Sequence, residues 1–165
     1  MNTFPKRRVL IAVFIVYLGV VAALTILPTH APRFRSRYLD HINVIPFEYS
    51  FKCFLVPKTM HPNLLPFCLR NTLGNIALFL PLGILLPLVS KRYRSLGRVA
   101  LIALCLSLTI EMIQFLSQFI GNPRSVDIDD VLLNTIGACL GLLIYWLNST
   151  KSSTTSDKDR VLSST

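Results

Sequence analysis

Acidic residues are scarce in this sequence, which carries eight Asp and Glu against 17 Lys and Arg. Charged residues make up only 15% of its 165 residues, and a mean hydropathy of +0.56 is too apolar for a typical soluble domain of this length. Histidine is also sparse, and His30, His41 and His61 stand at irregular spacing. We therefore expect neither a metal site nor a cofactor.

Cysteine is used sparingly, with four residues and no C-x-x-C motif. Cys105 and Cys139 lie inside apolar runs, where small core residues are the simplest interpretation. Cys53 and Cys68 lie closer to the N-terminus and could form a disulfide in an oxidising compartment. Their pairing does not follow from the sequence alone.

Long apolar runs explain the high hydropathy. They cover residues 9–27, 73–89, 99–120 and 131–147. A helix needs about 17–25 apolar residues to cross the hydrocarbon core. Lipid offers no hydrogen-bond partners, so the backbone of a spanning segment must form its hydrogen bonds within the segment, as a helix does. We predict an all-α polytopic membrane protein, a bundle of four transmembrane helices within one domain, residues 1–148. A soluble bundle would need amphipathic faces, which these runs lack.

The first run could instead be a cleaved signal peptide, because Lys6-Arg7-Arg8 precedes it. The run is longer than the roughly 7–15 residues of such a segment, and Pro32 follows the only tolerable cleavage site. An uncleaved first helix is favoured.

The net charge of +9 suggests nucleic-acid binding at first sight. The basic residues are dispersed over the loops, without aromatic interleaving, so we expect no nucleic-acid partner. Membrane topology explains them better, since the short segments 6–8 and 91–94 are basic. We predict a multi-pass protein of the cell inner (cytoplasmic) membrane with both termini cytoplasmic. The main observation against this topology is that it places three basic residues, Arg33, Arg35 and Arg37, in a loop outside the cell.

Two segments fall outside the predicted bundle. Residues 28–70 form an outer loop whose many prolines argue against long helix. The tail, residues 149–165, is rich in Ser, Thr and charge, and is predicted to be a disordered cytoplasmic segment.

Polar residues inside the apolar runs share helix faces. Asn71 and Asn75 are four residues apart at the outer end of the second helix. Glu111 and Gln114 lie on one stripe of the third helix, and Asp130 and Asn134 on one stripe of the fourth. An ionisable group such as Glu111 is costly at membrane depth and marks a candidate functional site.

We predict that these stripes meet in a polar pocket in the outer half of the bundle. Its proposed members are Asn71, Asn75, Glu111, Gln114, Arg124, Asp127, Asp130 and Asn134. Each residue alone also has a structural interpretation, because an Asp at a helix start suits an N-cap and amides can join neighbouring helices. Glu111 needs a partner or a raised pKa at that depth.

The motifs resemble the VanZ-like family of small membrane proteins. The matching elements lie between residues 43 and 141: Asn43-x-x-Pro46-Phe47, Asn71-x-x-x-Asn75-x-x-x-Phe79-x-Pro81-x-Gly83, Glu111-x-x-Gln114, and Arg124-x-x-Asp127-x-x-Asp130-x-x-x-Asn134-x-x-Gly137. The resemblance implies an integral membrane bundle of about this size. The family is named for a protein that lowers susceptibility to the glycopeptide teicoplanin, and it implies no settled mechanism.

Three functions fit this sequence. The first is a non-enzymatic envelope protein whose pocket binds a membrane lipid or cell-wall precursor head group, or modifies glycopeptide susceptibility. The second is a membrane-embedded enzyme that uses paired carboxylates as acid and base, although no nucleophile is recognised. The third is a structural or assembly partner, in which the polar stripes only hold helices together. The oligomeric state is open.

Overall fold

The computed structural model describes residues 4–26, 42–43, 45–47, 51, 55, 64–119 and 126–162, and every structural statement below concerns these residues. Four helices dominate: α1 (Phe4–Ile26), α3 (Leu64–Val89), α4 (Leu96–Gln118) and α5 (Ile128–Leu162). Each is long and apolar enough to cross a membrane, which confirms the predicted fold class.

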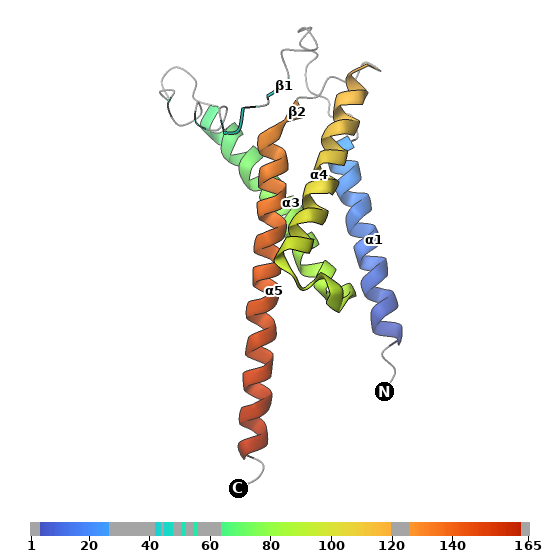
Figure 1. Ribbon diagram of the computed structural model, residues 1–165, viewed down its shortest axis with the longest axis vertical. Helices are drawn as coiled ribbons and strands as arrows, with labels where there is room; N and C mark the ends of the chain where they lie inside the picture. The colour runs from blue at the N-terminus through green and yellow to red at the C-terminus, as the bar shows by residue number, and fades with distance from the viewer. Residues whose placement is uncertain are drawn as a thin grey trace.

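The helices run alternately, so the described chain begins and ends on one side (Figure 1). We call this side the termini end. It also holds a short 3₁₀ turn, η2 (Lys91–Tyr93), between α3 and α4. The opposite side, the sheet end, carries two strands of two residues each, β1 (Ile42–Asn43) and β2 (Val126–Asp127). They pair in parallel, with Asn43 opposite Asp127, and so attach the segment after α1 to the start of α5.

Helix boundaries differ from the predicted ones mainly at two ends. α3 begins at Leu64 rather than residue 73, and takes in Pro66, because a proline in the first turn removes no helical hydrogen bond. α5 continues to Leu162 rather than ending at Leu147. Helical backbone thus extends into the tail predicted to be disordered, since adding a residue to an existing helix costs less than starting one.

Glycines allow α3 and α5 to pack backbone against backbone. A Cβ atom at Gly137 would overlap the carbonyl oxygen of Ile76, and one at Gly141 would overlap that of Leu80. From the other helix, a Cβ at Gly83 would overlap the carbonyl oxygen of Ala138. Small residues that admit such close approach are typical of helix pairs in membranes. Gly137 and Gly141, one turn apart on α5, therefore form a small-residue face that packs on α3.

The core lies where α3, α4 and α5 meet, around the buried side chains of Phe79, Leu82, Val99 and Leu142. α1 joins it through Val21 and through Tyr17, whose hydroxyl donates to the carbonyl oxygen of Leu78 at 2.8 Å. The outward faces are strongly apolar. Large exposed side chains include Val16, Leu24, Leu101, Met112 and Leu147, as a lipid-facing surface requires.

The close contact gives a prediction for Gly137→Ala. The added methyl group has no room, so we expect this variant to lose about 1–3 kcal/mol of folding free energy, measured by unfolding in detergent. Gly74→Ala is the matched control, because a Cβ there meets nothing within 4 Å. This variant should be neutral or gain up to about 1 kcal/mol from helix propensity. Equal stability of the two variants would contradict the packing.

Candidate functional site

The first turn of α5 organises the sheet end. Asp127 stands just before the helix, and its Oδ1 accepts a hydrogen bond from the backbone N–H of Asp129 at 2.9 Å. This is the geometry of an N-cap, which satisfies a donor that the helix leaves open. Asp129 and Asp130 follow in the first turn, where the positive end of the helix dipole favours negative charge. Local sequence thus gathers three carboxylates at one helix start.

Two of these carboxylates hold the segment that contains β1. The Asn43 amide donates to Asp127 Oδ1 at 3.1 Å, and the backbone N–H of Phe47 donates to Asp129 Oδ1 at 2.5 Å. Phe47 has a φ of 61°, a left-handed conformation that is uncommon for a bulky residue. Asp129 is only 2% exposed. The bond from Phe47 therefore links an unusual turn to a buried carboxylate.

The third carboxylate joins α5 to α3. Asn71 and Asn75 both donate their amide nitrogens to Asp130 Oδ1, at 3.0 and 2.5 Å. The two asparagines are one turn apart on α3, as their spacing predicts. The structure therefore brings Asn71, Asn75 and Asp130 together.

Glu111 is buried beneath this cluster, with 7% of its surface exposed. Its Oε2 accepts a hydrogen bond from the backbone N–H of Asp127 at 3.2 Å, so α4 meets the cap of α5 here. Glu111 lies deep within the apolar run of α4, and this bond joins it to the carboxylates at the start of α5.

One turn further into the bundle, Asn134 of α5 faces Ser107 of α4. The Asn134 amide nitrogen lies 2.8 Å from Ser107 Oγ, and both residues are buried. The amide oxygen, Oδ1, has no hydrogen-bond partner in the described part of the chain. Buried polar atoms are nearly always paired, so this acceptor requires an explanation.

Gln114, also proposed for the pocket, is buried on α4. Its amide donates to the backbone carbonyl oxygen of Thr25 at 2.8 Å, which ties α4 to α1 rather than to the acidic cluster. Arg124, the one basic residue proposed for the pocket, lies outside the described residues.

Sequence reasoning placed Asn43 only within the family motif, did not include Asp129 in the pocket, and missed Ser107. The signal for Ser107 was its position four residues before Glu111, on the same helix face. Because a serine is common in membrane helices, that signal is weak.

The Asp127 carboxyl lies just before the membrane span of α5. Burial raises the pKa of the Asp127 carboxyl, and the nearby Asp129 charge adds to the rise, against the hydrogen bonds from Asp129 and Asn43. The described members supply mainly carboxylate and amide oxygens. The cluster is therefore rich in acceptors.

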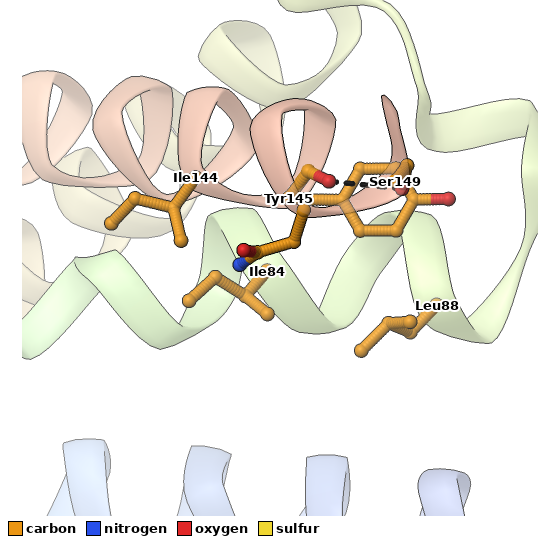
Figure 2. Close-up of a pocket in the computed structure, with 6 residues that line it drawn as sticks. Ile84, Leu88, Ile144, Tyr145 and Ser149 are labelled. Atoms are coloured by element: carbon orange, nitrogen blue, oxygen red, sulfur yellow. Dashed lines mark hydrogen bonds between the residues drawn. The ribbon is translucent and has the colours of Figure 1, made fainter. Parts of the chain in front are cut away.

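A hollow that the structure describes lies at the other end of the bundle. It measures about 360 Å³ and lies between α3 and α5 near the termini end (Figure 2). Its lining residues are Ile84, Leu88, Ile144, Tyr145, Asn148 and Ser149. None of them belongs to the polar cluster, so this hollow is separate from the predicted pocket.

These features define a polytopic membrane protein with a polar cluster buried at one end of its bundle. The family described as VanZ/LLP1 matches residues 14–149, and the chain belongs to that family. Protein VanZ of Enterococcus faecium is 40% identical over 104 residues, which cover 61% of this chain. The match also spans 61% of that relative's length. No solved structure matches the chain.

The bond between Asn75 and Asp130 can be tested with a double-mutant cycle. We expect Asn75→Ala and Asp130→Ala to destabilise the protein less than additively, with a coupling of about 1.5–3 kcal/mol, because each removes the same charge-assisted hydrogen bond. Unfolding in detergent measures it. Thr109→Ala, on the exposed side of α4, should add independently to Asp130→Ala. Additive losses for Asn75 and Asp130 would rule the bond out.

Proposed function

We propose that this protein is a non-enzymatic envelope protein whose polar cluster at the sheet end binds the head group of a lipid or cell-wall precursor. Occupancy of the cluster would change how a glycopeptide antibiotic reaches that precursor. Membership of the VanZ/LLP1 family supports the link to the antibiotic, because the relative in Enterococcus faecium carries the name VanZ.

The observation that carries the proposal is the unpaired amide oxygen of Asn134. This side chain is 3% exposed, yet Oδ1 has no donor within the described residues. Leaving a buried acceptor unpaired costs about 1–3 kcal/mol, which a ligand that donates a hydrogen bond would recover.

The surroundings of Asn134 suit a ligand that enters from the sheet end. Ser107 lies beside it, and Glu111 lies one helical turn closer to the sheet end, a rise of about 6 Å. On α5, Asp130 stands one turn above Asn134 in the same direction. A ligand in line with these groups would meet the Asn134 amide oxygen, the Ser107 hydroxyl and then carboxyl groups.

Acceptors select a ligand with donors. Hydroxyl and ammonium groups meet this requirement, and both occur on lipid head groups and on the sugars and peptides of cell-wall precursors. The buried position also excludes water, which strengthens each hydrogen bond. Membrane lipids, a precursor or the glycopeptide itself are thus the proposed partners.

We further propose that the sheet end faces outward and that both termini are cytoplasmic, in the inner (cytoplasmic) membrane. Cys68, at the sheet end of α3, is disulfide-bonded, which is typical of an oxidising compartment. At the termini end, the turn between α3 and α4 carries Lys91, Arg92 and Arg94, as the positive-inside rule requires of a cytoplasmic loop.

Orientation can be tested with single-cysteine labelling. In a protein whose four native cysteines, Cys53, Cys68, Cys105 and Cys139, are replaced by Ser, a membrane-impermeant maleimide on intact cells should label Phe119→Cys at the sheet end of α4. It should leave Ser95→Cys, at the termini end, unlabelled until the membrane is opened. The reverse pattern would invert the topology.

The binding site is best tested with the paired variant Ser107→Ala plus Asn134→Leu. Replacing both partners by apolar groups should leave stability unchanged or raise it, because no buried donor or acceptor then remains unpaired at this position. We expect unchanged abundance in the membrane and loss of the protein's effect on glycopeptide susceptibility. Mass spectrometry of the purified protein should show loss of the co-purifying lipid or precursor. Thr109→Ala, on the exposed side of α4, is the control.

The second candidate function is a structural or assembly role for the polar cluster. It is favoured by the hydrogen bonds that Asp127, Asp129 and Asp130 make to other segments. If the cluster only holds helices together, Glu111→Gln should lower abundance while the effect per molecule stays constant. Binding predicts that Glu111→Gln, which keeps its size, alters the effect per molecule at normal abundance.

A further inference from the structure

The hollow near the termini end is lined by four apolar or aromatic side chains and two polar ones. Figure 2 shows Ile84 and Leu88 on α3 beside Ile144 and Tyr145 on α5. Asn148 and Ser149 complete the lining and lie one helical turn nearer the end of the membrane span than Ile144 and Tyr145. The hollow is therefore apolar toward the bilayer and polar toward its surface.

Cations stand next to this hollow. The Arg94 guanidinium lies 5.5 Å from the centroid of the Tyr145 ring, which itself lines the hollow. This cation–π contact places a positive charge beside the hollow. Lys91 and Arg92 are exposed in the same turn, and Arg98 is exposed at the start of α4.

The stretches of α3, η2, α4 and α5 next to the hollow contain no carboxylate. The sequence has no Asp or Glu from Leu64 to Ile110, which covers α3, η2 and the adjoining half of α4. It has none from Val131 to Ser156 either, which includes the lining residues of α5. No carboxylate in these stretches neutralises the charge beside the hollow, which is therefore available to an external anion.

We propose that the hollow between α3 and α5 binds an anionic phospholipid. Its phosphate lies at the basic turn, near Arg94 and Lys91, since guanidinium and ammonium groups are the usual phosphate partners. Its ester groups lie level with Asn148, and one acyl chain follows Leu88, Ile84 and Ile144 into the bilayer. Basic pockets between membrane helices recognise lipids in this way. The site is independent of the cluster at the sheet end.

The single tryptophan reports on this site. Trp146 follows Tyr145 in the chain and is 38% exposed. The full-length protein is placed in phosphatidylcholine vesicles that contain a minor fraction of brominated phosphatidylglycerol or, separately, brominated phosphatidylcholine. We expect the anionic lipid to quench Trp146 more strongly, as about fivefold enrichment at the site would produce.

Variants that remove or restore a positive charge test whether Arg94 binds the anionic lipid. Arg94→Gln should remove most of the preference for phosphatidylglycerol, and Arg94→Lys should restore it because the charge returns. Arg70→Gln, on the sheet end of α3, should leave the preference unchanged. Thermal unfolding checks that each variant is folded. Ile84→Phe fills the hollow and should also lower the preference without changing any charge.

Several results would overturn the proposal. Equal quenching by the two lipids in the wild-type protein would leave no anionic site. An unchanged preference in Arg94→Gln would place the anion elsewhere. If Trp146 were quenched by neither lipid in the wild type, a second copy or the tail would cover the hollow. Native mass spectrometry and removal of residues 151–165 would then identify which one.

Discussion

The close contact between the backbones of α3 and α5 is the constraint on which the rest of the structure depends. Gly83, Gly137 and Gly141 let the two helices approach until carbonyl oxygens stand where Cβ atoms would be. At that separation Asn75 on α3 can reach Asp130 on α5. With wider spacing, short asparagine side chains would not span the gap. The polar cluster therefore exists because a small-residue face sets the distance between these helices.

The N-terminus of α5 is hydrogen-bonded to several other segments of the chain. Asp127, Asp129 and Asp130 bind the β1 segment, the turn at Phe47 and α3, while the Asp127 backbone reaches Glu111 on α4. Carboxylates at a helix start are favoured by the dipole and by unpaired N–H groups. One helix turn thus joins four parts of the chain. This explains how a costly acid such as Glu111 is accommodated at membrane depth.

The bundle has two ends of opposite chemistry. The sheet end gathers carboxylates and amides, whereas the termini end presents Lys91, Arg92 and Arg94 around an apolar hollow. Acceptors at one end favour ligands with donors, and cations at the other favour anions. The proposed head-group site and the proposed phospholipid site each rest on one side of this asymmetry.

Sequence alone determined the four spanning helices, because apolar runs of bilayer length allow no other structure in lipid. It also determined which residues share a helix face, so the Asn71, Asn75 and Asp130 group was predictable. Only the tertiary structure decided which faces meet: Gln114 contacts α1 through Thr25, and Ser107 partners Asn134. It also paired Asn43 with Asp127 across more than eighty residues. Helix periodicity specifies the direction of a side chain, whereas its partner depends on how helices pack, which no local spacing encodes.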